Sequence, residues 1–332
     1  MLLVGLMTGN SVFGQRIASP YEVGTWQGFK PAAISYTFDD NCPNQLSTAV
    51  PLFDKFNFKL TLFTVINWNP NWAGLQAVAS NGHEVASHTV THSSLDSLSD
   101  AFQTKEYLDS KNTINSKITG QKCLTIAYPF CTNGNSNLCS EYYIAGRGCD
   151  GFLASSTPRD FMYISSINCG TEGQVKTASE FNARVESATS KKWCVFMIHG
   201  IDDDGCFSPV QSSELSLHLN YVTSNSSKFW VNTFGNVVRY IKERNAVSLT
   251  VLSGNSKRIS IQLTDSLNNS IYNYPVSIRR PLPKGWKTAS VKQGKVMLTA
   301  QLITLNSVNY IQFDAIPNAG TIVISKRKTS HS

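Results

Sequence analysis

The sequence lacks several features that would each assign it to a particular class of protein. Only 15% of its 332 residues are charged and 41% are hydrophobic, which excludes a disordered chain or a coiled coil. No apolar run approaches the roughly 18 to 20 residues of a membrane-spanning helix, so we expect no membrane span. The eight cysteines form no CxxC pair, which argues against a zinc ribbon. Internal repeats and low-complexity linkers are also absent, and we therefore expect folded units in close contact.

Acidic residues are scarce in the last quarter of the chain. From Val251 onward the sequence has 11 lysines and arginines but only Asp265 and Asp314 as acids. This part carries +9, whereas the whole chain carries +7, which leaves −2 for the first 250 residues. The split indicates two units with different surfaces, and a solvated basic face is its simplest explanation. We expect no nucleic-acid partner.

The N-terminus has no basic residue before its apolar stretch, yet it resembles the end of a secretion signal. Met1–Met7 is mostly apolar, and Val12 and Gly14 occupy positions that a signal peptidase reads. An ordinary apolar arm is the alternative. In an exported chain some cysteines should form disulfides, although sequence does not give their connectivity, whereas Cys194 lies in an apolar run and should be a buried free thiol. We predict a secreted or periplasmic protein.

Residues 30–246 alternate apolar runs with amphipathic stretches. Runs that are apolar on both faces and separated by helices indicate a parallel sheet, and seven of them suit an α/β barrel. The predicted strands are Ala32–Phe38, Leu60–Ile66, Glu84–Ser87, Leu124–Pro129, Gly151–Ser155, Trp193–Ile198 and Phe229–Thr233. The predicted helices are Gln45–Phe56, Asn71–Ser80, Ser99–Ile118, Ala178–Ser190, Ser212–Ser224 and Gly235–Arg244.

Residues 247–332 have a different pattern. Short alternating strands follow one another, with turn residues between them and no helical stretch of ten residues. We predict a small β-sandwich accessory domain here. Residues 1–29 would be a signal remnant and an N-terminal arm. The expected strands are Val247–Leu252, Arg258–Asp265, Tyr274–Arg279, Lys295–Leu302, Tyr310–Ile316 and Gly320–Lys326.

Three short segments of the larger unit carry candidate chemistry. Asp39 and Asp40 end the first apolar strand, where one carboxylate can bind a metal and its neighbour can transfer a proton. His88 and His92 are four residues apart, which would place both imidazoles on one face of a helical turn. His199 ends a later apolar strand. Each segment alone is commonplace, but a carboxylate with two histidines suits metal-assisted hydrolysis.

These segments resemble the successive motifs of a known family. Thr37-Phe38-Asp39-Asp40, the stretch from His83 to Leu95, Ala127-Tyr128-Pro129-Phe130 and the strand that ends in His199 are similar to motifs of the polysaccharide deacetylases. These enzymes form carbohydrate esterase family 4 and share the NodB homology domain. The resemblance covers residues 30–245. It implies a distorted (β/α) barrel of about seven strands with a site at the carboxyl ends of the strands.

The resemblance also implies a role for each matching residue. Asp40, His88 and His92 would bind a divalent metal, most often Zn²⁺. Asp39 would be the general base, and His199 would protonate the departing amine or alcohol.

Further residues would contact the substrate. The backbone N–H of Phe130 would stabilise the oxyanion. Trp68 and Trp72 lie in a polar loop that is typical of sugar stacking, although core packing of one of them is equally compatible, and Tyr128 would line the acetyl pocket.

The sequence departs from the family pattern at three places. Many members have an arginine that pairs with the base where this chain has Ala127. The usual final glycine of the same motif is Cys131. The aspartate that orients the acidic histidine has no clear counterpart, and Asp150, Asp160 and the Asp202–Asp204 run remain open.

We therefore predict a deacetylase that acts on an N-acetylated or O-acetylated glycan, with N-acetylglucosamine polymers ahead of acetylated xylan. One alternative is a catalytically weak glycan-binding protein that keeps the barrel. Another is a metal phosphoesterase, which the lack of a second His and Asp cluster disfavours. In the basic C-terminal domain, Arg279-Arg280 and Lys326-Arg327-Lys328 would contact an acidic cell-wall polymer.

Overall fold

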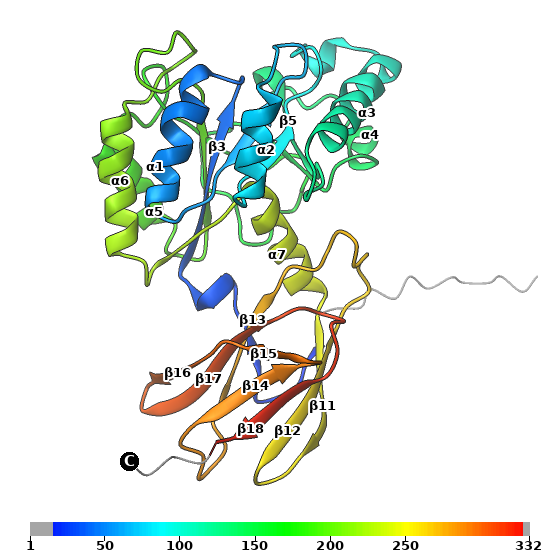
Figure 1. The fold of residues 1–332 in the computed structure, drawn as a ribbon, viewed down its shortest axis with the longest axis vertical. Coiled ribbons are helices and arrows are strands. Elements are labelled where there is room, and N and C mark those ends of the chain that lie inside the picture. The colour runs from blue at the N-terminus through cyan, green and yellow to red at the C-terminus, as the bar shows by residue number, and fades with distance from the viewer. Residues whose placement is uncertain (1–15, 328–332) are drawn as a thin grey trace, which may run out of the picture. The chain divides into compact units, whose positions relative to one another are not determined.

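The structure, a computed structural model, describes residues 16–327, and the predicted signal remnant lies outside them. The chain forms two compact units (Figure 1). The larger unit comprises Thr25–Ile241, and the smaller one combines the residues up to Gly24 with those from Lys242 onward. Within residues 16–327, no helix is both long enough and apolar enough to cross a lipid bilayer.

The larger unit alternates strands and helices along most of its length. Its strands are β3 (Ala32–Asp39), β4 (Thr61–Thr64), β5 (Glu84–Ser87), β6 (Thr125–Ala127), β7 (Ala145–Arg147), β8 (Ile167–Asn168), β9 (Trp193–Ile198) and β10 (Phe229–Val231). Its α-helices are α1 (Val50–Lys55), α2 (Trp72–Ser80), α3 (Asp100–Lys117), α4 (Ser136–Ser140), α5 (Ala178–Ser187), α6 (Ser212–Ser224) and α7 (Phe234–Ala246), the last of which crosses the boundary between the units. A π-helix, η2 (Gln45–Ala49), precedes α1, and three short 3₁₀ helices are η1 (Gln27–Phe29), η3 (Leu95–Ser97) and η4 (Pro129–Cys131).

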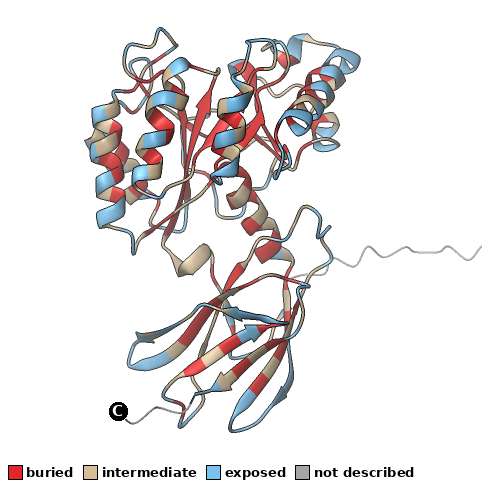
Figure 2. Cartoon of the chain, in the orientation of Figure 1, coloured by how far each residue is buried: buried red, intermediate tan, exposed pale blue. Residues whose placement is uncertain are grey.

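A parallel sheet of eight strands forms the centre of this unit. Seven strands follow the order β7-β6-β5-β4-β3-β9-β8, and β10 pairs with the first half of β3. Every residue of β3 and β9 is buried, while the helices expose their outer faces (Figure 2). The predicted α/β class with about seven barrel strands is confirmed, in the form of an open half-barrel. All strands run in the same direction, so their carboxyl ends meet at one edge.

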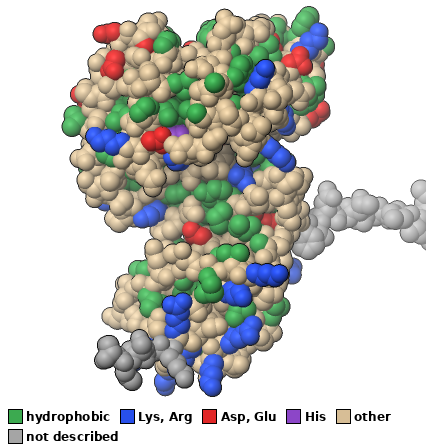
Figure 3. Space-filling view, in the orientation of Figure 1, with side chains coloured by type: hydrophobic (Ala, Val, Ile, Leu, Met, Phe, Trp, Pro, Cys, Tyr) green, Lys and Arg blue, Asp and Glu red, His purple; other side chains and the backbone are tan. Residues whose placement is uncertain are grey.

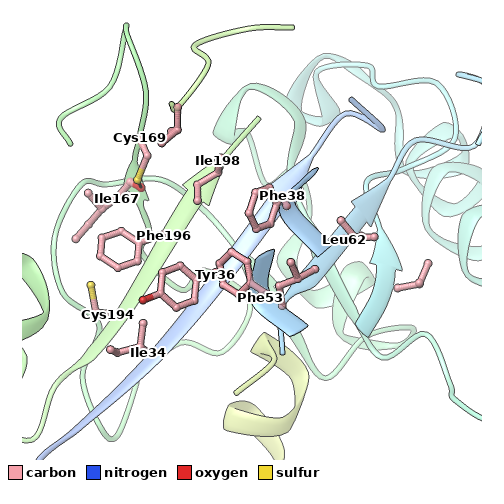
Figure 4. Packing of buried hydrophobic residues seen from close by; sticks show 14 of the residues in the cluster. Ile34, Tyr36, Phe38, Phe53, Leu62, Ile167, Cys169, Cys194, Phe196 and Ile198 are labelled. Atoms are coloured by element: carbon pink, nitrogen blue, oxygen red, sulfur yellow. Dashed lines mark hydrogen bonds between the residues drawn. The ribbon is translucent and has the colours of Figure 1, made fainter. Parts of the chain in front are cut away.

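Aromatic and aliphatic side chains from neighbouring strands build the core. Tyr36 of β3 contacts Phe53 of α1 and Phe196 of β9, with ring centroids 4.8 and 5.4 Å apart (Figure 4). Cys194 lies in the same core as a buried free thiol, as the sequence predicts. This packing fixes β3 against β9, which carry Asp39 and His199 at their ends.

In the larger unit, one predicted strand is wrong, and two real strands escape the sequence pattern. Gly151–Ser155 is irregular except for a single bridge at Ala154, because its chain bends at Gly151, which has a φ of +83°. The sheet instead uses β7 and β8. They are only three and two residues long, and β7 reads Ala-Gly-Arg, which has no apolar run to mark it.

The smaller unit consists of two sheets whose strand pairs are antiparallel except for β1 and β11, which run parallel, and residues from both ends of the described chain contribute strands. A six-stranded sheet has the order β1-β11-β12-β18-β14-β15, and a four-stranded sheet has the order β16-β17-β13-β2. Alternate residues, such as Ile259, Ile261 and Leu263, are buried, which is the period of two that the sequence indicated. The strands are β1 (Arg16–Ile17), β2 (Glu22–Val23), β11 (Ser248–Gly254), β12 (Arg258–Thr264), β13 (Val276–Pro281), β14 (Ala289–Gln293), β15 (Val296–Leu298), β16 (Ala300–Leu305), β17 (Val308–Ala315) and β18 (Ile322–Lys326).

Candidate functional site

The predicted site residues come together at the carboxyl ends of the parallel strands. Asp39 is the last residue of β3 and Asp40 follows it. His88 comes directly after β5, and His199 directly after β9. Because β3 pairs with β9, and β5 lies two strands away, these side chains converge over the same edge.

Asp40, His88 and His92 form a compact group of potential metal ligands. One ligand atom from each residue lies within 4.8 Å of the others. The Nε2 atoms of His88 and His92 are 3.4 and 3.3 Å from Oδ1 of Asp40, and this buried oxygen accepts no hydrogen bond. Burial alone would raise the pKa of Asp40, but the two imidazoles outweigh it and hold that pKa well below its usual range. The carboxylate is therefore ionised and faces two nitrogen donors.

A loop, and not the expected helical turn, brings the two histidines together. Residues 88–94 have no helical hydrogen bonding, and Thr89 and His92 adopt positive φ angles of 66° and 61°. Glu106 of α3 accepts hydrogen bonds from the backbone N–H groups of Val90 and Thr91, at 2.7 and 2.9 Å. A tight loop that is hydrogen-bonded to α3 thus brings the rings of His88 and His92 together, with their centroids 4.9 Å apart.

The ring of His88 is oriented by its own second nitrogen. Nδ1 donates to the backbone carbonyl of Ala127 at 2.8 Å, which leaves Nε2 directed towards Asp40. Burial lowers the pKa of His88, but the nearby carboxylates of Asp39 and Asp40 outweigh this effect and raise it. Negative charge is concentrated around the ring, as expected for a place that receives a cation.

Asp39 is buried and ion-paired with an arginine that the sequence reasoning missed. Its Oδ2 accepts a hydrogen bond from Nη2 of Arg147, the last residue of β7, and both side chains are almost inaccessible to water. Oδ1 of Asp39 is buried without a hydrogen-bond partner. The only hint in the sequence was a charged residue in a short Ala-Gly-Arg segment.

His199 faces both aspartates. Its Nε2 is 3.8 Å from Oδ2 of Asp39 and 3.9 Å from Oδ2 of Asp40. Burial lowers the pKa of this imidazole and outweighs the two nearby carboxylates, which act to raise it. Its Nδ1 is buried and makes no hydrogen bond.

Three of the aspartates considered as orienting partners for His199 instead accept hydrogen bonds from backbone N–H groups. Asp160 accepts from the N–H of Met162 at 2.7 Å. Asp202 accepts from the N–H of Ser212, and Asp204 accepts from the N–H groups of Ile201 and Cys206. Asp202 and Asp204 thus shape the loop after β9 and do not contact the imidazole through Nδ1.

Three exposed aromatic rings lie against the histidines. Trp68 is 4.6 Å and Phe130 is 4.8 Å from the ring of His92, measured between ring centroids. Phe207, which the sequence analysis did not select, is 5.1 Å from the ring of His199. All three are exposed by 45% or more, so they offer apolar surface around the site.

The other two predicted substrate contacts lie elsewhere. Tyr128 is buried, and its hydroxyl donates a hydrogen bond to the carbonyl of Met162 at 2.7 Å. Both the ring and the hydroxyl are therefore part of the core. Trp72 begins α2 and packs against the core. Tyr128 therefore lies beneath the surface, and of the two tryptophans Trp68 is the one beside the histidines.

Two disulfides flank the site. Cys42 pairs with Cys206 and joins the loop after Asp40 to the loop that carries Phe207. Cys131 pairs with Cys149 and joins the loop after Phe130 to the segment after Arg147. Each bond links loops that follow different strands of the sheet.

Comparison with known proteins agrees with this geometry. Residues 27–142 match the protein-family model described as polysaccharide deacetylase. A gellan lyase from a Bacillus species is 27% identical over 326 residues, which cover 91% of this chain but 13% of that much longer protein.

One solved structure supports the fold of the larger unit, and a second is less similar. A putative polysaccharide deacetylase from Mycobacterium smegmatis has a TM-score of 0.51 at 14% identity, covering 70% of this chain and 98% of that one. The Xyl-CE4 domain of a multidomain xylanase from the hindgut metagenome of Trinervitermes trinervoides has a TM-score of 0.46 at 15% identity, covering 62% of this chain and 88% of that one.

The predicted resemblance is thus confirmed. Residues 27–142 therefore match the polysaccharide deacetylase family, which is carbohydrate esterase family 4 or the NodB type, and the half-barrel that contains them shares the fold of a solved putative deacetylase.

Proposed function

We propose that this protein is a metal-dependent hydrolase that removes acetyl groups from a glycan. One observation carries the proposal: three ligand atoms of Asp40, His88 and His92 lie within 4.8 Å of one another, and Asp39 and His199 face the same point. A carboxylate and two histidines leave coordination positions open, as hydrolytic sites require.

The donor set fits a divalent cation, for which we propose Zn²⁺. Oδ1 of Asp40 is buried, ionised and without a hydrogen bond, and it lies between two imidazole nitrogens that point towards it. Nitrogen and oxygen donors together suit zinc better than magnesium or calcium. When bound, the ion would polarise the acetyl carbonyl and lower the pKa of water.

The chain's own residues would handle the protons. Asp39 would accept a proton from the attacking water through Oδ1, since Oδ2 is already bonded to Arg147. His199 would donate a proton to the departing amine or alcohol; its Nε2 faces the two aspartates. The backbone N–H of Phe130 would stabilise the oxyanion in a turn where Phe130 and Cys131 have φ angles of 54° and 64°.

We propose an acetylated polysaccharide or oligosaccharide as the substrate. The exposed rings of Trp68, Phe130 and Phe207 provide stacking surfaces for the apolar faces of sugars. N-acetylglucosamine polymers come first, then acetylated xylan, and the relative named gellan lyase adds gellan to the substrates worth assaying.

The test is acetate release from acetylated chitooligosaccharides, acetylated xylan and gellan, with and without added zinc. We expect activity that a chelator abolishes and zinc restores. Asp39→Asn should lower kcat by about 10² to 10⁴ while zinc binding is kept, because the amide cannot accept the proton of the attacking water and the three proposed metal ligands are unchanged. The control is Asp109→Asn on the exposed face of α3, which should not change kcat. Full activity of Asp39→Asn would disprove the assignment of the base.

The same assay separates the alternatives. A catalytically weak glycan-binding protein would retain oligosaccharide affinity but release no acetate. A phosphoesterase would hydrolyse 4-nitrophenyl phosphate in preference to 4-nitrophenyl acetate.

We further propose that the protein works outside the cytoplasm and that its smaller unit contacts an acidic cell-wall polymer. Two disulfides are compatible with an oxidising compartment. The excess of lysine and arginine in the smaller unit is the basis for the second part of this proposal.

A further inference from the structure

The third motif departs from the family pattern at two positions, and both positions lie beside residues of one short segment, 147–149. The third motif has Ala127 where many members have arginine, and Cys131 where glycine is usual. In the sheet, Ala127 of β6 is in register with Arg147 of β7. Two residues further on, Cys149 forms a disulfide with Cys131. The segment 147–149 thus lies beside both altered positions.

Arg147 is held rigidly on its own strand. It is 1% exposed, and its guanidinium lies over the ring of Phe63, 5.4 Å from the centroid. Nη1 donates to Oγ of Ser166 at 3.0 Å, and this hydroxyl donates in turn to the carbonyl of Gly148 at 2.6 Å. A buried guanidinium needs a carboxylate partner, and Asp39 supplies it. The hydrogen bond to Oδ2 leaves Oδ1 as the free oxygen of Asp39.

The second contact fixes the loop that carries Phe130. Cys131 has a φ of 64°, in the left-handed region that favours glycine. Its N–H donates to the carbonyl of Tyr128, and its carbonyl accepts from the hydroxyl of Tyr163, both at 3.1 Å. Together with the disulfide to Cys149, these bonds hold a conformation that a side chain would otherwise disfavour.

We propose that residues 147–149 replace the arginine and the glycine of the third motif. Arg147 is a positioning residue that orients Asp39 from the neighbouring strand, and Cys149 holds the turn that presents the N–H of Phe130. This inference rests on the proposed deacetylase function for its kinetic readout.

The test moves the arginine between strands. Arg147→Met should lower kcat/KM for acetate release by about 10²-fold, mainly through kcat, because Asp39 loses its orientation. Adding Ala127→Arg to this variant should raise kcat/KM again by at least tenfold. Residues in register on adjacent strands lie about 4.8 Å apart and share a face, so the new arginine can reach Asp39. Arg147→Lys should be intermediate, because it keeps the charge and loses the forked geometry. Activity of Arg147→Met within threefold of the parent protein would overturn the proposal.

The glycine half of the proposal has its own variant. Cys149→Ala should lower kcat by about tenfold, and Cys131→Gly in the same chain should restore it, because glycine adopts the positive φ without the disulfide. Failure of glycine to restore activity in a variant that circular dichroism shows to be folded at the assay temperature would overturn this half.

A second measurement does not depend on activity. In a double-mutant cycle of thermal unfolding, Arg147→Met and Asp39→Asn should each lower Tm, whereas the double variant should lose less than the sum, because it leaves no unpaired buried charge. If the parent chain releases no acetate while this coupling is present, the deacetylase function fails and the positioning contact stands. Additive shifts in Tm together with unimpaired catalysis would reject the contact itself.

Discussion

A buried histidine outside the site, His218 of α6, has a role in the core. Its Nδ1 donates to Oδ1 of Asn182, and its Nε2 accepts from the hydroxyl of Tyr36, both at 2.7 Å. The ring stacks on Phe181, with the centroids 5.0 Å apart. Burial lowers the pKa of His218 to about 3. The folded protein therefore keeps this imidazole neutral at pH values where the unfolded chain protonates it.

This difference predicts a loss of stability in mild acid. The unfolded chain binds a proton at His218 near pH 6.5, and the folded protein binds it only near pH 3, so the stabilising contribution is complete above pH 6.5 and declines as the pH falls through this window. Between pH 7 and pH 5, His218 should account for about 2 kcal/mol of the decrease in unfolding free energy. The unfolding free energy of the His218→Gln variant, measured by urea titration, should fall less over this pH range than that of the parent protein. Equal decreases in the two proteins would contradict the role assigned to His218.

Single residues also show how far the sequence could predict the site. Asp39, Asp40 and His199 were found because each ends an apolar run, and in a parallel sheet such ends meet. Arg147 was missed because its ion pair with Asp39 bridges 108 residues of sequence and its strand has no apolar pattern. A contact between such distant positions depends on strand order, which the order of residues alone does not give.

At the scale of elements, the disulfide Cys42–Cys206 links the loops after β3 and β9, which lie 164 residues apart. The other bond, Cys131–Cys149, closes a separation of 18 residues. A longer closed loop restricts the unfolded chain more.

We therefore expect unequal losses when each bond is removed. Cys42→Ala with Cys206→Ala should lower the unfolding free energy by about 5 kcal/mol, and Cys131→Ala with Cys149→Ala by about 3 kcal/mol. Chemical denaturation without reductant measures both values relative to the oxidised parent protein, and the parent protein in reductant gives the loss of both bonds together. A smaller loss for the 42–206 pair would contradict the loop-entropy explanation.

The sequence predicted long elements better than short ones. Ala32–Phe38 and Trp193–Ile198 agree with β3 and β9 because fully buried strands have continuous apolar runs. The loop at residues 88–92 was mistaken for a helical turn because a spacing of four fits both, and only the backbone angles separate them.

At the scale of the whole molecule, the positive charge is concentrated in the smaller unit. Arg279 is paired with Glu22, and Arg280 donates to the hydroxyl of Tyr21. Lys326 and Arg327 instead lie at the end of β18. Their backbone N–H groups donate to the carbonyls of Lys257 and Thr288, so Lys257 and Lys287 lie close to them along the backbone. Figure 3 shows several lysine and arginine side chains spread over the surface of this unit.

This arrangement predicts which cations contact an acidic polymer. Lys257→Gln, Lys326→Gln and Arg327→Gln together should weaken retention on a polygalacturonate gel by at least fivefold at low salt, and added salt should remove the difference. Lys105→Gln with Lys117→Gln in α3 removes charge from the larger unit and should not change retention. Retention that is independent of salt would count against an electrostatic contact.

Both ends of the described chain belong to the smaller unit, where β1 pairs with β11 and β2 pairs with β13. The half-barrel unit is therefore inserted between two segments that are joined to each other by backbone hydrogen bonds. If tension is applied to the chain on either side of residues 16–327, the force passes through these β pairings and bypasses the half-barrel. The strand pairs β1–β11 and β2–β13 would therefore have to separate before such a load reached Asp39, Asp40 and the nearby histidines.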